Sequence, residues 1–536
     1  MKEEEKMKHM KKLFGLLLAV VMVFAMSVSV FADAKVTVEG DSKGILTNHT
    51  FKAYQIVKGT VAENVLTDPF WGDGVDTSTF LAELQEEATF SNCSRVDDFV
   101  KILSDNNTDS ALAEKVAKIA YKNKKGVGSD ISTTASASLE TGYYLIVDTT
   151  KNLAEGSAYN AALLRVVGDV TIAVKTDAPE VEKKVKENTK YNQNDTSTQG
   201  YSYGEGYNDV ADYNIGDTVP FSFYSKVPDM SKYDTYKYVF HDTMSEGLTL
   251  DKSTIKVTIG TTELTADQYT VKTTGLDKGC TFEVEITNLK AIPQATVETE
   301  IRVDFGAVLN ENAEIGLPGN PNEVHLEYSS NPNETKETNN TPVDRVIVFT
   351  YELDTTKIDG ATASNENPTK LPGAEFKLRA NNGKWVQVNS ATHRVTGWTD
   401  DENAASVLVS DKNGIFKVIG LDAGTYQLKE TKAPENYNLL KDLITVEITA
   451  ATTNGQGWDT AKYPVDALTN ISVTADGKNG TGDVDTGTAN ITIANNKGGS
   501  LPSTGGIGTT IFYVVGGILM AVAAIFLITK KKMSNK

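Results

Sequence analysis

Cysteine is almost absent from this sequence. Cys93 and Cys280 are the only two among 536 residues, whereas an extracellular fold stapled by disulfide bonds needs several. The two cysteines fall in different predicted domains, so we expect no bond between them. The sequence therefore excludes a disulfide scaffold, and any covalent reinforcement has to come from other side chains.

Positive charge is also scarce. Lysine and arginine number 52 against 71 aspartate and glutamate residues, which gives a formal net charge of −19. Phosphate backbones and anionic lipid surfaces repel an acidic protein. We therefore expect no nucleic acid partner.

Histidine is rare and dispersed. The five histidines, at positions 9, 49, 241, 325 and 393, lie far apart in the sequence. No H-E-x-x-H, G-x-S-x-G or glycine-rich phosphate loop is present. We therefore expect no metal site and no cofactor. We do not predict an enzyme, since the only reactions that we expect are those of the chain with itself.

What dominates the chain instead is the alternation of apolar and polar residues that half-buried strands show. Helical periodicity is confined to 77–88, 95–104 and 110–123. We predict a mainly β fold of tandem immunoglobulin-like sandwiches, with a small helical insertion in the first. The clearest strand patterns cover 34–40, 254–260, 280–289, 298–306, 323–329, 344–353, 442–450 and 489–495.

The length without its two ends suggests three domains. We place them at 35–174, 175–350 and 351–499, between a signal peptide at 1–34 and a tail at 500–536. The segments that join the domains read as strands and not as flexible linkers.

One strand pattern occurs twice. "LETGYYLIVD" at 139–148 and "LDAGTYQLKE" at 421–430 share leucine, acid, glycine, tyrosine, aliphatic and acid at matching positions. If the tyrosine and the aliphatic residue face inward, strand alternation turns Asp148 and Glu430 inward as well. A buried carboxyl group needs a partner. The alternative is that each acid stands at a strand end and reaches solvent.

Both ends carry export features. Near the start, two lysines precede an apolar run over 13–26, and small residues fit cleavage after Ala32 or Ala34. Near the end, residues 509–529 carry no charge and are long enough to cross a bilayer as a transmembrane helix. A cluster of lysines follows directly, and such a cluster stays on the cytoplasmic side.

A short motif stands just outside this apolar segment: Leu501, Pro502, Ser503, Thr504 and Gly505. The proline fixes φ and discourages helix, so the stretch can lie extended in an enzyme groove. Motif, span and basic tail together resemble the LPxTG sorting signal of Gram-positive surface proteins. The resemblance implies that a sortase cysteine attacks the Thr504 carbonyl, releases Gly505 onward and passes the chain to an amine.

The third domain carries a second resemblance. "YELDTTKIDG" at 351–360, "YQLKETKAPENYN" at 426–438 and "ITIANNKGG" at 491–499 are similar to a B-type repeat of collagen-binding adhesins and pilins. The resemblance implies an intramolecular isopeptide bond between Lys357 and Asn495, assisted by Glu430.

The chemistry of such a bond is consistent with burial. Burial disfavours the charged ammonium, so the amine becomes a nucleophile, and a neutral carboxylic acid can shuttle protons as ammonia leaves. Folding supplies the effective concentration. The alternative is that Lys357 and Glu430 form a plain salt bridge.

The second domain resembles the middle domain of pilus backbone subunits, which also forms a Lys–Asn bond. The resemblance implies Lys183 and Asn322 as the reacting pair, with Asp242 assisting. The rivals are Lys184, Asn339 and Asn340, and the alternative is a solvated lysine and a turn asparagine.

The first domain has Asp148 but lacks an asparagine in the last strand pattern, so we predict no isopeptide bond there and expect Asp148 to have another partner or partial exposure.

The joining lysine of pilus backbone subunits, carried by a V-Y-P-K element, corresponds to Lys175. Ala173 and Val174 replace the Tyr and Pro, so the alternative is an ordinary interdomain lysine.

Taken together, the chain resembles the major backbone subunit of a sortase-assembled fimbria. This implies a secreted precursor that is held briefly in the membrane, then linked to identical subunits and to peptidoglycan on a Gram-positive cell, where it supports adhesion. Tip and basal pilins and a host ligand are further expected partners. The alternative is a monomeric wall-anchored adhesin that binds a host or matrix ligand. A minor basal pilin ranks last, since the short length and Pro-rich tail of that class are lacking.

Overall fold

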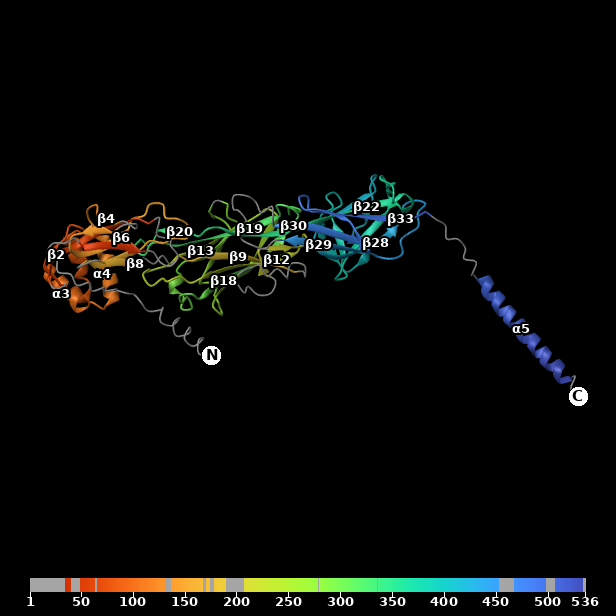
Figure 1. Ribbon diagram of the computed structural model, residues 1–536, viewed down its shortest axis with the longest axis horizontal. Helices are drawn as coiled ribbons and strands as arrows, with labels where there is room; N and C mark the ends of the chain where they lie inside the picture. The colour runs from red at the N-terminus through yellow and green to blue at the C-terminus, as the bar shows by residue number, and fades with distance from the viewer. Residues whose placement is uncertain are drawn as a thin grey trace. The chain divides into compact units, whose positions relative to one another are not determined.

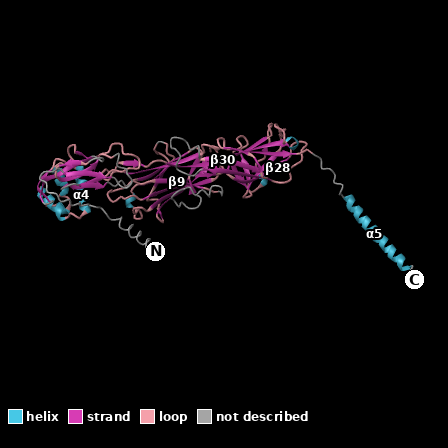
Figure 2. Cartoon of the chain, in the orientation of Figure 1, coloured by secondary structure: helices cyan, strands magenta, loops and turns pink. Residues whose placement is uncertain are grey.

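The structure is a computed structural model, and strands are its predominant regular element (Figure 2). Its described residues form two compact units. One unit contains the described residues up to Glu314 together with Pro318–Phe349, Thr452 and Ala467. The other contains Ile315–Leu317, Thr350–Ala451 and the described residues from Leu468 onward. The division into three domains remains a prediction. The described residues are 34–39, 49–62, 65–131, 136–166, 170–173, 178–188, 207–277, 279–334, 336–452, 467–497 and 507–533.

The N-terminal part is built in three layers. A five-stranded sheet has the order β3-β2-β6-β7, with β4 paired to β2, and a three-stranded sheet has the order β5-β1-β8. The helices follow β3 and lie beside the larger sheet (Figure 1). The strands are β1 (Ala34–Glu39), β2 (Phe51–Ala62), β3 (Val65–Trp71), β4 (Ser129–Ile131), β5 (Ala137–Leu139), β6 (Gly142–Asp148), β7 (Ala161–Val166) and β8 (Val170–Ala173).

The three helices are α2 (Thr77–Leu84), α3 (Val96–Asp105) and α4 (Ser110–Lys122), which confirms the predicted helical insertion. Phe80, Phe99 and Val116 bury the helices against one face of the five-stranded sheet, where they meet Leu145 and Val147 of β6. The other face of β6 packs on the small sheet. Apolar residues on both faces of β6 therefore hold the layers together.

The middle part is a sandwich of two sheets. Their orders are β10-β9-β12-β18-β14-β15 and β11-β21-β19-β13-β17-β16, with β20 paired to β19. Phe223 stacks on Phe240 across the two sheets, with ring centroids 5.4 Å apart. The strands are β9 (Val181–Lys186), β10 (Tyr207–Asn208), β11 (Val210–Asp212), β12 (Thr218–Lys226), β13 (Tyr238–Met244), β14 (Leu248–Ile259), β15 (Thr262–Glu263), β16 (Thr270–Lys272), β17 (Phe282–Ile286), β18 (Glu300–Leu309), β19 (Asn320–Ser329), β20 (Thr338–Asn340) and β21 (Asp344–Phe349).

The second unit is also a two-sheet sandwich. Its sheets have the orders β27-β22-β33-β32 and β25-β24-β23-β28-β29-β30-β31, with β26 paired to β23. Phe376 and Phe416 stack in its core. The strands are β22 (Tyr351–Asp359), β23 (Glu375–Ala380), β24 (Trp385–Val388), β25 (Val395–Thr399), β26 (Leu408–Val409), β27 (Ile415–Leu421), β28 (Gly424–Lys432), β29 (Ile444–Thr452), β30 (Leu468–Ala475), β31 (Lys478–Asn479), β32 (Thr481–Asp483) and β33 (Thr488–Asn495).

The described residues end with one long helix, α5 (Ile507–Met533) (Figure 1). Its segment Ile511–Lys531 is long and apolar enough to cross a membrane. The helix and the two-sheet parts agree with the predicted mainly β fold and its C-terminal apolar helix. The signal peptide lies outside the described residues.

Candidate functional site

The three residues predicted to react in the third domain lie together in the core of the second unit. The first and last long strands, β22 and β33, pair in parallel, with Lys357 opposite Ile493 and Asp359 opposite Asn495. Lys357 and Asn495 are fully buried, and Glu430 of β28 is buried as well. The alternation read from the sequence therefore turns all three side chains inward.

The contacts among these groups form a closed cluster. The Lys357 amine donates to the Asn495 side-chain oxygen and lies 3.7 Å from a Glu430 oxygen. The Asn495 amide nitrogen donates to both Glu430 oxygens at 3.0 Å and to the Asn438 carbonyl at 2.8 Å. The amine, the amide and an acid thus touch in a dry site, as amide transfer between them requires.

Burial changes the protonation of the amine in this cluster. It lowers the pKa of Lys357 to about 8, and the opposing effect of Glu430 does not restore it. The amine also lies 5.6 Å from the centre of the Phe376 ring. A substantial neutral fraction is therefore present near physiological pH, and only the neutral amine can attack a carbonyl carbon.

The middle sandwich holds a second cluster. Lys183 of β9 crosses between the sheets, and its amine contacts the Asp242 carboxyl group of β13 and lies 3.1 Å from the Glu323 carbonyl oxygen. The neighbouring residue Asn322 is fully buried, and neither polar atom of its amide has a hydrogen-bond partner among the described residues. An unpaired buried polar atom costs about 1–3 kcal/mol. Asp242 pairs with Val324, two residues after Asn322 in β19, so the unsatisfied amide lies on the same inner face one strand step from the buried acid.

Burial brings the two titrating groups of this cluster closer in proton affinity. It lowers the pKa of Lys183 from 10.5 to about 8 and raises the pKa of Asp242 from 3.8 to about 6. Transfer of the proton from lysine to aspartate therefore costs much less free energy than it would between the same two groups in water. The resulting pair, a neutral amine and a neutral acid, is the pair that isopeptide chemistry needs.

The rival residues are engaged elsewhere. The Lys184 amine lies 2.5 Å from an Asp209 oxygen, as expected for a side chain that alternates away from Lys183. The Asn339 amide donates to the Ala154 carbonyl at 2.7 Å, and Asn340 is exposed. The geometry therefore favours Lys183 and Asn322 over Lys184, Asn339 and Asn340.

The N-terminal part places a different group beside its buried acid. Asp148 is buried together with Tyr144 and Ile146, which confirms the predicted inward face. His49 lies 2.6 Å from one Asp148 oxygen, and the Thr150 hydroxyl donates to the other at 2.5 Å. Asp148 therefore has the non-lysine partners that the sequence led us to expect.

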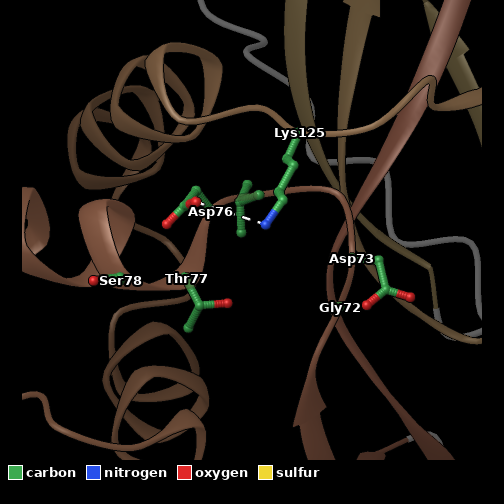
Figure 3. Close-up of a pocket in the computed structure, with 7 residues that line it drawn as sticks. Gly72, Asp73, Asp76, Thr77, Ser78 and Lys125 are labelled. Carbon is green, nitrogen blue, oxygen red and sulfur yellow. Dashed lines mark ion pairs between the residues drawn. The ribbon is translucent and has the colours of Figure 1, made fainter.

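A further hollow lies where α2 begins (Figure 3). Asp76 accepts from the Thr79 backbone N–H, which lowers the pKa of Asp76. Lys125 points toward Asp76, with the charged atoms 3.6 Å apart (Figure 3). These charged groups serve the helix start and each other, so this cavity of about 330 Å³ does not resemble a reaction site.

Some contributors to the two clusters could not be read from the sequence. The Asn438 and Glu323 carbonyls contact the side chains that are predicted to react through main-chain atoms, which carry no residue signature. Lys175 and the motif residues Leu501, Pro502, Ser503, Thr504 and Gly505 lie outside the described residues.

Three family models match separate segments of the chain. Residues 215–332 match the Cna-B-like domain of Gram-positive pilin backbone subunit 2, residues 353–460 match a prealbumin-like fold domain, and residues 493–535 match the LPXTG cell wall anchor motif. The first two matches cover most of the two sandwiches that hold the clusters. The third includes the motif and the apolar helix.

Two relatives agree with these matches. The trypsin-resistant surface T6 protein of Streptococcus pyogenes serotype M6 is 26% identical over 379 residues, which cover 59% of this chain and 65% of that protein. The chain therefore spans about 65% of the length of this curated relative. The solved T6 backbone pilin of serotype M6 S. pyogenes shares the fold, with a TM-score of 0.51 and 19% identity over 89% of this chain and 100% of that one.

The anchor motif and the apolar C-terminal helix indicate a surface protein attached to the cell wall of a Gram-positive bacterium. Its two central sandwiches match domain types named for pilin backbones and prealbumin-like folds. The chain thus contains a domain of the Gram-positive pilin backbone type, a prealbumin-like domain and an LPXTG cell wall anchor.

Proposed function

We propose that this chain is the shaft subunit of a covalent, cell-wall-anchored fimbria that supports adhesion. Support comes from the pilin backbone match over 215–332 together with the anchor match over 493–535. In this function a sortase cleaves after Thr504 and joins its carbonyl to Lys175 of the next subunit. Repetition of one such head-to-tail contact builds an open fibre, and peptidoglycan receives its end.

Two internal cross-links are part of the proposal. In the second unit the Lys357 amine attacks the side-chain carbonyl carbon of Asn495, the carbon–nitrogen bond to the amide nitrogen breaks, and ammonia leaves. Glu430 carries the proton from the amine to the departing nitrogen. The observation that supports this most strongly is the mutual contact of amine, amide and carboxyl groups in a fully buried cluster.

The same reaction is proposed between Lys183 and Asn322, with Asp242 as the proton carrier. The cross-link consumes a buried amine and the amide nitrogen of Asn322, which otherwise has no partner among the described residues. It thereby removes a destabilising buried charge and an unsatisfied donor at once.

A fibre bearing these bonds resists force because the load passes through covalent links between strands. In the second unit the bond joins β22 to β33, adjacent parallel strands at the two ends of the sandwich sequence. Tension along the chain then bypasses the segment between them. No disulfide bond is needed, which fits the two free cysteines.

Cell-wall extracts boiled in detergent test the fibre. We expect a ladder of high-mass species from cells that carry the chain and a matching sortase. Lys175→Ala should remove the ladder and leave one wall-linked band, whereas Lys151→Ala, a change at an exposed lysine, should leave it intact. A single band from the unaltered chain would refute the shaft function and favour the monomeric wall-anchored adhesin.

A further inference from the structure

A polar cavity of about 220 Å³ lies beside β13, β16, β17 and β19 of the middle sandwich. His241 lies next to Asp242 in β13, so strand alternation turns its ring to the opposite side of the sheet from the Lys183 cluster. The His241 side chain is nonetheless almost fully buried, at 3% exposure. The cavity is therefore a second polar site, on the opposite face of β13 from the predicted reaction centre.

Two carboxylates face one nitrogen of this ring. The His241 Nδ1 atom lies 3.4 Å from a Glu283 oxygen and 3.9 Å from an Asp277 oxygen. One ligand atom from each residue lies within 4.8 Å of the other two. The Asp277 backbone N–H also donates to Glu283 at 3.1 Å, which holds the segment after β16 against β17.

The other ring nitrogen is fixed by Glu327. Its carboxylate lies 3.3 Å from His241 Nε2. A carboxylate can only accept, so Nε2 carries the proton. The other ring nitrogen, Nδ1, faces Asp277 and Glu283. A carboxylate behind a histidine in this manner is the usual outer support of a metal-binding imidazole.

The surrounding charges leave a deficit of positive charge. Four carboxylates and two lysine amines line the cavity, so the acidic side chains outnumber the lysines by two. The His325 ring lies parallel to the His241 ring, with centroids 4.6 Å apart. A divalent cation would balance the site. The charged lining residues are Asp277, Glu283, Glu285, Glu327, Lys237 and Lys272.

We propose that His241, Asp277 and Glu283 bind a divalent transition-metal ion of the Zn²⁺ class. Ligand atoms at ~2.0–2.2 Å from a tetrahedral Zn²⁺ lie about 3.3–3.6 Å from one another. The Nδ1 atom of His241 lies 3.4 Å from Glu283 and 3.9 Å from Asp277, so small side-chain shifts would complete this geometry. The imidazole nitrogen selects such ions over Ca²⁺ and Mg²⁺, which take oxygen ligands. Water or the Cys280 thiol, whose sulfur lies 3.9 Å from Nδ1, completes the coordination.

The metal would act as a clamp. It ties the connection between β16 and β17 to the middle of β13, where the Thr281 backbone N–H already bonds to the Asp242 carbonyl. Metal binding only to the folded state stabilises that state. This site does not depend on fibre assembly or on the isopeptide bonds, so it stands apart from the proposed function.

Calorimetric titration of the untagged full chain in detergent, stripped of metal with a chelator, tests the site. We expect Zn²⁺ to bind at one equivalent per chain and Ca²⁺ at least 10-fold more weakly. Asp277→Asn should weaken Zn²⁺ binding at least 10-fold, and Glu327→Gln should weaken it about 10–100-fold. Asp277 is 77% exposed, so its substitution should not prevent folding, and a thermal melt without metal checks this.

The matched control is His393→Asn, at a histidine of the other unit with a positive φ that asparagine accepts. It should leave Zn²⁺ binding unchanged. Zn²⁺ should also raise the melting temperature of the unaltered chain and not that of Asp277→Asn. Equal binding of Zn²⁺ by the unaltered chain and Asp277→Asn, or equal affinity for Ca²⁺ and Zn²⁺, would overturn the proposal.

Discussion

Substitution of Glu430 by Gln separates the proposed cross-link from the packing around it. Gln has the same shape but cannot carry a proton from Lys357 to the departing nitrogen of Asn495. We therefore expect a folded chain in which this bond does not form. Its mass, corrected for the substitution, should exceed that of the unaltered chain by one ammonia molecule.

The loss of stability can be worked out from the length of the loop that the bond closes. Lys357 and Asn495 are separated by 138 positions. A cross-link that closes a loop of this length lowers the entropy of the unfolded chain by an amount worth ~5 kcal/mol at 25 °C. For a unit of this size, such a loss corresponds to a decrease in melting temperature of roughly 10–20 °C.

Differential scanning calorimetry together with intact-mass measurement gives the readout. Glu447→Gln, the same chemical change on the adjacent strand β29, is the matched control and should change neither the mass balance nor the melting temperature appreciably. An unaltered chain whose mass equals that of corrected Glu430→Gln, or two melting temperatures that coincide, would refute the reasoning.

Three further predictions concern the other buried groups. Lys183→Ala and Asn322→Ala should each abolish one ammonia loss in mass spectra, whereas Lys184→Ala and Asn339→Ala should keep it; the opposite pattern would reassign the bond. Bond formation in the second unit should become faster as pH rises from about 6 to 9, because the pKa of Lys357 is lowered to about 8 and the neutral fraction of its amine grows through that range. The rate can be measured by refolding the chain from inclusion bodies at a series of pH values and following the loss of mass. A rate that keeps rising up to the ordinary pKa of lysine would contradict the lowered pKa. Asp148→Ala should lower the free energy of unfolding by roughly 3 kcal/mol, because it leaves buried His49 without its partner, and it should change the mass only by the substitution itself. Unfolding in denaturant measures this loss. An unchanged midpoint of unfolding would show that the His49–Asp148 pair contributes little to stability.

Much of the fold could be predicted from the sequence because strand alternation and helix periodicity are local properties. The helices at α2, α3 and α4 fall where the periodicity predicts them. The inward position of Glu430 follows from the Tyr426 and Leu428 that share its face, and all three are buried. Local patterns thus predict which side chains enter a core.

The sequence does not predict which residues of distant strands come into contact. The approach of Lys183 to Asp242 depends on how two sheets face each other, and the resemblance to pilins supplied that expectation. His241 and Glu283 are 42 positions apart in the printed sequence, so the sequence did not predict that they meet. The antiparallel register of β13 and β17 places them directly opposite each other.

The contrast between Asp148 and Glu430 also shows that a local sequence pattern does not predict the partner of a buried side chain. Both end the same repeated strand pattern and both are buried. One meets a histidine and a threonine, and the other meets a lysine and an asparagine. The partner, and hence the chemistry, is set by strands elsewhere in each fold.

Intact-mass spectrometry of residues 35–499, followed by mapping of tryptic peptides, tests the central claim most directly. We expect a mass lower than the sequence mass by two ammonia molecules, with peptides that contain Lys183 joined to Asn322 and Lys357 joined to Asn495. A loss of one ammonia mapped to the second unit would contradict the middle cross-link alone. An unshifted mass would contradict both bonds and leave these lysines and asparagines as mere buried neighbours.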